Sequence, residues 1–363
     1  MKFDVFKKRS QPLIGVDICS TSVKMVELAE IGQGDYRVER YAIAPYAKAK
    51  DNESPEAVVD GNVTNLELLS ATIRQAWKLM NTRERRVALA LPTAAVISKK
   101  VLIQANLSET DMELQVEAEA NQYIPFSLDE VNIDFQVLGP SPHNADDVEV
   151  LIAASRKEKI EDRVAAAEDA ELKVVIMDVE TYATEAAYVF AVKQLPNAGR
   201  EQTVMIVDIG SVMMHINILH DNKSVYIREQ AFGGAHLTQE IQHRFGLTLD
   251  EAEVAKRRGG LPENYEADVL KPFVQSLAME VARAVQFFTS STQYNHVDHI
   301  MLCGGCATMP GVDAAIAERT QVNTVIANPF MSMAISSHIK PQLLGEDAPS
   351  LMIACGLAMR RFD

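Results

Sequence analysis

The 363-residue sequence has few cysteines, no excess of positive charge and no long hydrophobic run. Its four cysteines are too few for a disulfide scaffold. The 35 Lys and Arg against 50 Asp and Glu give a net charge of −15, and this balance argues against nucleic acid as the main partner, because phosphate backbones are bound by clustered positive charge. No apolar stretch approaches the roughly 20 residues of a membrane helix, and the N-terminus lacks a secretory signal. We therefore expect a cytoplasmic protein.

A short basic tail precedes the first apolar strand. Residues 1–11 contain Lys2, Lys7, Lys8 and Arg9, a local inversion of charge in an acidic chain. Two interpretations stay open. The tail is a frayed terminus with solubilising charges, or it makes a weak contact with anionic lipid or an acidic partner.

The sequence indicates two similar halves. A length of 363 residues with 47% apolar residues predicts two or three domains with sizeable cores. Residues 13–28 predict an apolar strand, an Asp at its end, a small polar turn and an apolar return strand. The same order recurs at residues 204–219, which is typical of an internal repeat. Within the first half, a new segment starts near residue 85 and predicts a small unit of strand, helix, strand and strand that ends near residue 154.

The two Asp-containing hairpins carry the chemistry. Asp17 and Asp208 each stand at the end of a strand, before a tight turn whose backbone N–H groups can hold phosphate oxygens. A carboxylate there can hold Mg²⁺ or its waters, so two facing hairpins would hold a metal–triphosphate complex between two domains. Lys24 can turn back toward a phosphate, and Gly210 is expected to allow close approach and a positive φ. Taken singly, each hairpin could be an ordinary turn capped by Asp.

Three segments resemble a known superfamily. Residues 15–24 (GVDICSTSVK) and 207–211 (VDIGS) resemble the two phosphate loops of the actin, sugar kinase and Hsp70 superfamily, and residues 301–307 (MLCGGCA) resemble its adenosine motif. Within it, the chain resembles from end to end the PilM family of actin-like type IV pilus assembly proteins, with the division protein FtsA as a near relative. The resemblance implies an α/β, two-lobed actin-like fold of two RNase H-like domains, with an FtsA-type inserted small subdomain.

The resemblance also implies domain boundaries. After the tail at residues 1–11, the first lobe comprises 12–85 and 162–198, with the inserted domain at 86–161. The second lobe comprises 199–235 and 296–363, with a helical subdomain at 236–295. The last helix is a candidate for packing on the first lobe.

ATP or ADP with Mg²⁺ is the implied cofactor, with Asp17 and Asp208 holding the metal through water. The residues expected to contact the nucleotide are Asp17, Cys19, Ser20, Thr21, Ser22, Lys24, Asp208, Gly210, Ser211, Gly233, Gly234, Glu253, Lys256, Gly304 and Gly305. Glu253 and Lys256 could equally form an ordinary surface pair. Cys19 stands where the first loop usually carries Gly, and it would cost about 1 kcal/mol if that position needed a positive φ.

Hydrolysis needs a group that orients the attacking water. Asp178 and Glu180 are the candidates, although Asp178 could instead cap the following helix. We expect at most a slow ATPase.

The family resemblance further implies a set of partners. The first is the N-terminal cytoplasmic tail of PilN, an inner-membrane pilus protein, in a groove that involves the inserted domain. Other pilus platform proteins and pilus motor ATPases are further candidates, as is a second copy of the chain. These contacts would place the protein at the inner face of the inner membrane. Two alternatives stay open: a small-molecule phosphotransferase of the sugar or acetate kinase type, and an FtsA-like filament-forming protein.

Overall fold

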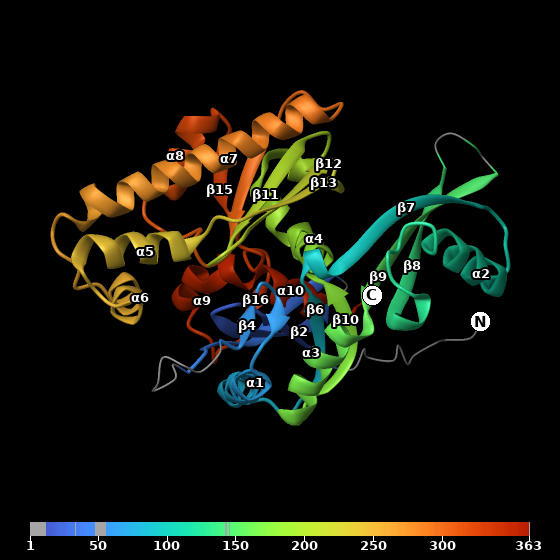
Figure 1. The fold of residues 1–363 in the computed structure, drawn as a ribbon, viewed down its shortest axis with the longest axis horizontal. Helices are drawn as coiled ribbons and strands as arrows, with labels where there is room; N and C mark the ends of the chain where they lie inside the picture. Colours follow the sequence, from blue (N-terminus) through green and yellow to red (C-terminus); the bar gives the residue numbers. More distant parts are fainter. Residues whose placement is uncertain (1–11, 33, 48–55, 142–143, 145, 363) are drawn as a thin grey trace.

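The computed structural model describes residues 12–32, 34–47, 56–141, 144 and 146–362. The basic tail at 1–11 lies outside the described residues, so its two interpretations stay open. Figure 1 shows two larger α/β bodies, with a smaller strand and helix unit extending to one side. The main sheets have six, five and three strands.

The six-stranded sheet forms the first lobe, in the order β10-β6-β1-β2-β3-β16. β1, β2 and β3 are antiparallel neighbours, and β6 and β10 extend the sheet in parallel from β1. Helices α1 and α3 cover one face, because their apolar residues share a core with alternate residues of β1. The elements are β1 (Ile14–Ile18), β2 (Ser22–Gly32), β3 (Asp35–Pro45), β4 (Val58–Val59), β5 (Asn62–Val63), α1 (Leu66–Met80), β6 (Arg86–Leu91), α3 (Lys157–Asp169), β10 (Lys173–Val179), α4 (Glu180–Ala191) and β16 (Ala334–Ile335).

The five-stranded sheet repeats this topology in the second lobe. Its order, β13-β12-β11-β14-β15, matches β3-β2-β1-β6-β10, with the same parallel and antiparallel pairings. The predicted internal repeat is therefore confirmed, and Asp17 and Asp208 occupy equivalent places. The elements are β11 (Thr203–Ile209), β12 (Met214–His220), β13 (Lys223–Gln230), α5 (Gly234–Phe245), α6 (Leu249–Arg258), a π-helical turn (Glu266–Leu270), α7 (Lys271–Ser291), β14 (His299–Cys303), α8 (Val312–Thr320), β15 (Asn323–Ile326), α9 (Pro341–Asp347) and α10 (Met352–Met359).

A three-stranded sheet, β7-β9-β8, forms the inserted unit together with α2. Its elements are β7 (Val96–Gln104), α2 (Glu109–Ala120), β8 (Val131–Pro140) and β9 (Asp147–Arg156). The expected limits of 86–161 need correction at both ends. Residues 86–91 form β6, a buried strand hydrogen-bonded between β1 and β10. Residues 157–161 begin α3, which packs in the first lobe. The inserted unit is therefore residues 96–156.

Two helices, α4 and α10, lie between the two large sheets, and one hydrophobic core joins both helices to β2, β11 and β14. Glycines let these elements meet backbone to backbone. A Cβ at Gly15 of β1 would lie 2.1 Å from the carbonyl oxygen of Ala354, and one at Gly356 would lie 1.7 Å from that of Ala183. The last helix thus packs on the first lobe.

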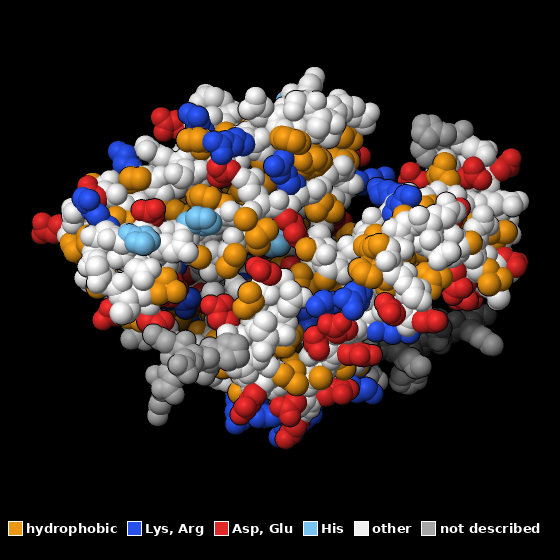
Figure 2. Space-filling view, viewed as in Figure 1, with side chains coloured by type: hydrophobic (Ala, Val, Ile, Leu, Met, Phe, Trp, Pro, Cys, Tyr) orange, Lys and Arg blue, Asp and Glu red, His pale blue; other side chains and the backbone are white. Residues whose placement is uncertain are grey.

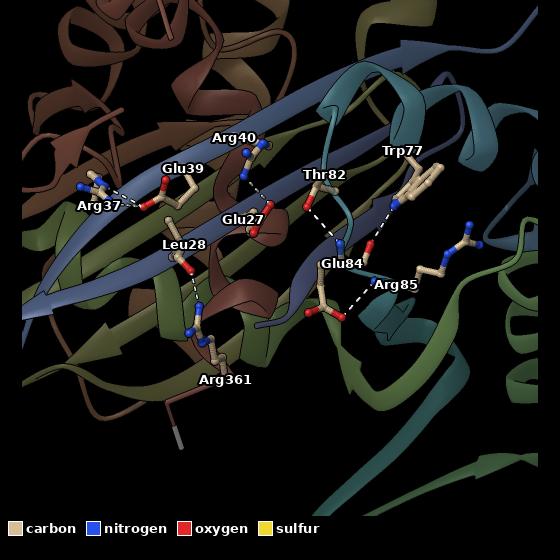
Figure 3. Close-up of polar contacts among 10 residues, drawn as sticks. All are labelled: Glu27, Leu28, Arg37, Glu39, Arg40, Trp77, Thr82, Glu84, Arg85 and Arg361. Carbon is tan, nitrogen blue, oxygen red and sulfur yellow. Dashed lines mark hydrogen bonds and ion pairs between the residues drawn. The ribbon is translucent and has the colours of Figure 1, made fainter. Parts of the chain in front are cut away.

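The end of the chain is tied to the first sheet. Arg360 Nε donates to Asp178 Oδ2 over 2.6 Å, and Arg361 Nη1 donates to the carbonyl oxygen of Leu28 over 2.7 Å (Figure 3). Leu28 follows Glu27, where the β2–β3 register shifts. These contacts hold α10 against the sheet whose central strands, β1 and β2, form the first Asp hairpin.

Candidate functional site

The first hairpin turn brings a thiol and an ammonium group onto one carboxylate. Lys24 lies directly across from Asp17 in the β1–β2 ladder, and its Nζ is 3.4 Å from Asp17 Oδ2. Cys19 Sγ donates to the same oxygen over 3.1 Å. The turn closes through Cys19 N–H and the carbonyl oxygen of Ser22, with Ser20 and Thr21 between them. Cys19 does not have a positive φ, so the strain expected there is absent.

The Lys24 ammonium interacts with an Asp from each of the two hairpins. Burial alone would lower the pKa of Lys24, but the neighbouring Cys19, Asp17 and Asp208 outweigh burial and raise it. Asp17 belongs to the first lobe and Asp208 to the second. Lys24 of the first lobe thus lies near enough to both Asp17 and Asp208 to interact electrostatically with each of them.

The second hairpin turn is closed against the start of α5. Gly234 N–H donates to the carbonyl oxygen of Gly210 over 3.1 Å, and a Cβ at Gly233 would lie 2.5 Å from that of Ser211. A Cβ at Gly210 would lie 2.8 Å from the carbonyl oxygen of Met213. Gly210 permits this close approach, but its φ is not positive, which corrects part of the expectation.

The two glycines after β14 differ in their surroundings. Gly304 has a φ of +88°, and a Cβ there would lie 2.3 Å from Asp208 Oδ1 and 2.5 Å from the carbonyl oxygen of Ile209. Gly305 is exposed, and a Cβ there would meet nothing within 4 Å. Close packing against the second hairpin therefore requires glycine at position 304, whereas the backbone at Gly305 is open to solvent.

Glu253 and Lys256 belong to a polar cluster rather than to an isolated surface pair. Lys256 Nζ lies 2.6 Å from Glu253 Oε2, 2.6 Å from Thr238 Oγ1 and 3.2 Å from the carbonyl oxygen of Gly234. Burial would raise the pKa of Glu253, but Lys256 and Thr238 lower it. A Cβ at Gly234 would also meet Cys306 Sγ at 2.7 Å. The cluster therefore adjoins the loop after β14.

The structure separates the two candidate catalytic carboxylates. Asp178 accepts from Arg360 Nε and from the backbone N–H of Val179, so both of its oxygens have structural partners. Glu180, the first residue of α4, lines a cavity of about 20 Å³, and a space of this size can hold one water. The other residues that line it are Thr93, Thr181, Thr184, Ile206, Asp208, His215, Ile216, Asn217, Ile227, Glu229 and Ile353.

Glu180 lies among charges from both lobes. Burial raises the pKa of its carboxyl to about 7, with Asp17 and Asp208 also raising it and His215 and Arg163 opposing. Burial and Asp17 likewise raise the pKa of Asp208, against His215 and Lys24. Negative charge from both lobes is therefore concentrated near Glu180, where His215 and Arg163 oppose it. Among the described residues, no group of three or more His, Cys, Asp and Glu side chains could hold a metal ion.

The sequence predictions gave no role to three charged residues that lie near Glu180. His215 lies directly opposite Asp208 in the β11–β12 ladder, and its Nδ1 is 3.3 Å from Glu229 Oε1 on β13. Arg163 of α3 is only 2% exposed, and its Nη2 donates to the carbonyl oxygen of Gly61 over 3.0 Å. The alternation of β12 places His215 on the face of Asp208, and that signal could have identified it.

Comparisons with known proteins agree with this architecture. The family model "Type IV pilus assembly protein PilM" matches residues 15–362. A solved PilM–PilN type IV pilus biogenesis complex is 25% identical and superimposes with a TM-score of 0.79, covering 98% of this chain and 99% of that chain. EutJ of Carboxydothermus hydrogenoformans is 14% identical with a TM-score of 0.58, covering 96% and 89%. MreB5 of Spiroplasma citri bound to ADP is 14% identical with a TM-score of 0.51, covering 96% and 95%.

Curated relatives match a shorter stretch. Ethanolamine utilization protein EutJ of Salmonella typhimurium (strain LT2) is 30% identical over 125 residues, which is 34% of this chain and 39% of that protein. EutJ of Escherichia coli (strain K12) is 30% identical over 136 residues, which is 38% and 43%. The chain thus spans less than half the length of the curated relatives it matches. Within the described part of the chain, no helix is both long and apolar enough to cross a membrane.

The structural relatives confirm the predicted actin-like fold. The family model extends from the first hairpin to the last described residue. The chain therefore belongs to the PilM family of type IV pilus assembly proteins.

Proposed function

We propose that this protein binds Mg-ATP between its two lobes and uses nucleotide occupancy to control binding of the PilN N-terminal cytoplasmic tail during type IV pilus assembly. One observation carries the nucleotide part of the proposal. Each lobe carries one Asp-ended hairpin of equivalent topology, and Lys24 interacts electrostatically with the Asp of both hairpins. Backbone N–H groups of tight turns are good phosphate ligands.

Each part of the cleft has a proposed role. Asp17 and Asp208 would hold Mg²⁺ through water, and the ion would neutralise phosphate charge. The open backbone at Gly305 would lie against the adenosine. Glu253 and Lys256, held beside the start of α5, would contact the ribose or base.

Glu180 is the better candidate for orienting an attacking water. The pKa of its carboxyl is about 7, and a general base works best with a pKa near the operating pH. Asp178 instead has a structural role, since Arg360 and the Val179 N–H occupy its oxygens. The proposed ATPase activity is slow at most.

The peptide site is proposed in the groove between the inserted unit (96–156) and the rest of the molecule. Figure 2 shows a hollow between these parts, with Lys and Arg side chains near it. Tyr182 OH of α4 donates to Ser98 Oγ of β7 over 3.0 Å. Burial raises the pKa of Glu185 in α4 against hydrogen bonds from Asn217 and Ser224, and Lys100 of β7 is a smaller opposing influence. Polar groups of α4 and β7 thus meet where the two bodies come together. PilN would place the protein at the inner face of the inner membrane, where other platform proteins and motor ATPases are further proposed partners.

Calorimetry with Mg-ATP and a synthetic PilN tail peptide tests both parts. We expect the wild-type protein to bind both ligands, and the Asp17→Ala and Asp208→Ala variants to bind Mg-ATP at least tenfold more weakly. Glu318→Gln removes an exposed acid on α8 and is the matched control, with circular dichroism as the check on folding. Unchanged Mg-ATP affinity in both Asp variants would refute the nucleotide site. ATP binding without peptide binding would favour a phosphotransferase or a filament-forming protein.

A further inference from the structure

One tyrosine from outside the first hairpin holds the turn of that hairpin, residues 19–22. Tyr46 is the residue after β3, and its backbone N–H donates to the carbonyl oxygen of Thr21 over 3.2 Å. Its side-chain hydroxyl donates to the carbonyl oxygen of Cys19 over 2.9 Å. A single residue thus binds two carbonyl groups of the turn, one on each side of Ser20.

The sheet and the first-lobe core fix the place of this tyrosine. Pro45, the last residue of β3, lies opposite Ser22 of β2 in the ladder, so Tyr46 stands where the pairing of the two strands ends. The ring of Tyr46 packs against the core to which β1, β2 and α1 contribute. Because its backbone and its ring are both held, the hydroxyl of Tyr46 has a fixed place beside the turn.

The two carbonyl contacts orient two peptide units of the turn. In a planar trans peptide unit, the C=O of one residue and the N–H of the next point in opposite directions. The Cys19 carbonyl points to the Tyr46 hydroxyl, so the N–H of Ser20 points to the other side. The Thr21 carbonyl likewise directs the N–H of Ser22 away from Tyr46. Within the described part of the chain, the Ser20 N–H donates to no backbone carbonyl. The turn therefore presents backbone donors on the side that Tyr46 leaves open.

We infer that Tyr46 is a positioning residue for phosphate, because it aims backbone N–H groups of the first hairpin turn toward the nucleotide. This inference rests on the proposed function and deepens it, since it concerns the same nucleotide site. Successive backbone N–H groups form an anion site when the chain holds them in a concave arrangement. Without the Tyr46 hydroxyl, the peptide unit between Cys19 and Ser20 is no longer held in this orientation. Tyr46 acts through the turn and needs no contact of its own with the nucleotide.

Removal of the hydroxyl alone tests the inference. Tyr46→Phe keeps the ring and the backbone contact with Thr21. Tyr41→Phe is the matched control, because Tyr41 lies on β3 and its hydroxyl donates to Asp347 Oδ2 over 3.0 Å, away from the turn. In calorimetry with a non-hydrolysable Mg-ATP analogue, Tyr46→Phe should bind about three- to tenfold more weakly than the wild type, as expected for one lost hydrogen bond, and Tyr41→Phe should change affinity less than about twofold. Urea unfolding checks that both variants are folded.

Amide hydrogen exchange separates positioning from a general loss of structure. At saturating analogue, residues 19–23 and 207–211 should both become protected from exchange in the wild type and in Tyr41→Phe. In Tyr46→Phe, the added protection should fall by about half or more at 19–23 and stay unchanged at 207–211.

The outcomes distinguish the inference from the proposed function. Wild-type affinity in Tyr46→Phe, full protection at 19–23, or an equal loss of protection at both turns would overturn the inference alone. A wild type that does not bind the analogue would refute the proposed function, and the inference would fail with it.

Discussion

Gly304→Ala should change the stability of the protein and Gly305→Ala its Mg-ATP affinity, although the two glycines are adjacent. Gly304 has a φ of +88°, and its missing side chain leaves room for Asp208 and Ile209. Gly305 is exposed with nothing near its missing side chain. We expect Gly304→Ala to destabilise the protein without any ligand. Gly305→Ala should leave the ligand-free protein unchanged and weaken Mg-ATP binding, because its methyl group would occupy the surface proposed for the adenosine.

The magnitude for Gly304→Ala follows from two contributions. An alanine in the left-handed region costs about 1–2 kcal/mol. Its Cβ would lie 2.3 Å from Asp208 Oδ1 and 2.5 Å from the carbonyl oxygen of Ile209, so backbone or side chain must move, and such overpacking costs about 1–3 kcal/mol. Unfolding free energy should therefore fall by roughly 2–5 kcal/mol. Gly305→Ala should change it by less than about 0.5 kcal/mol, as surface substitutions usually do.

Urea denaturation followed by circular dichroism measures both variants without nucleotide, and calorimetry then measures Mg-ATP affinity. A Gly304→Ala protein as stable as the wild type would refute the packing argument. A Gly305→Ala protein that binds Mg-ATP with wild-type affinity would remove Gly305 from the proposed adenosine surface, even if every stability prediction held.

Three other predictions concern interlobe packing, the chain end and pH. Gly356→Ala should lower the unfolding free energy by at least about 3 kcal/mol, because its Cβ would overlap the backbone of α4. Gly345→Ala, on the open side of α9, is the control. Its unfolding free energy in urea should stay within about 1 kcal/mol of the wild-type value. Asp178→Asn should lower the unfolding free energy by about 1–3 kcal/mol through its contact with Arg360, with Mg-ATP affinity in calorimetry changed less than twofold. The pKa of His215 is raised from 6.5 to about 9, so its stabilising contribution is present below pH 6.5 and is lost as pH rises toward 9. Stability should fall between pH 7 and 9, and His215→Gln should flatten that fall in pH-dependent urea unfolding.

The hairpins were predictable because their signals are local. A run of apolar residues, an Asp, a polar turn and an apolar return describe a strand pair without reference to the rest of the chain. The repeat of that pattern predicts the two-lobed topology. The boundaries of the inserted unit were not predictable in the same way. The buried strand at 86–91 looks alike whether it belongs to the first-lobe sheet or to a separate unit, and only its pairing with β1 and β10 decides.

His215 and Arg163 differ in how well the sequence alone predicts their positions. His215 shares a face with Asp208 through the alternation of an antiparallel pair, so the predicted hairpin already implied it. Arg163 stands three and four residues before Ala166 and Ala167, which are both buried on the inner side of α3. A charged residue on the apolar face of a helix is itself a signal that it has a buried partner. The identity of that partner, the Gly61 carbonyl, depends on tertiary packing.

The protonation state of Glu180 was the property least predictable from the sequence. Its position at the start of α4 follows from local pattern, but burial by the two lobes is the main cause that raises the pKa of its carboxyl to about 7. Near neutral pH, the carboxyl is therefore protonated in a large fraction of molecules and cannot accept a proton from water. A cation held by Asp17 and Asp208 would lower that pKa, because positive charge favours the carboxylate. The base would then be competent mainly when the metal site is filled, so the burial that creates the site also limits turnover without metal.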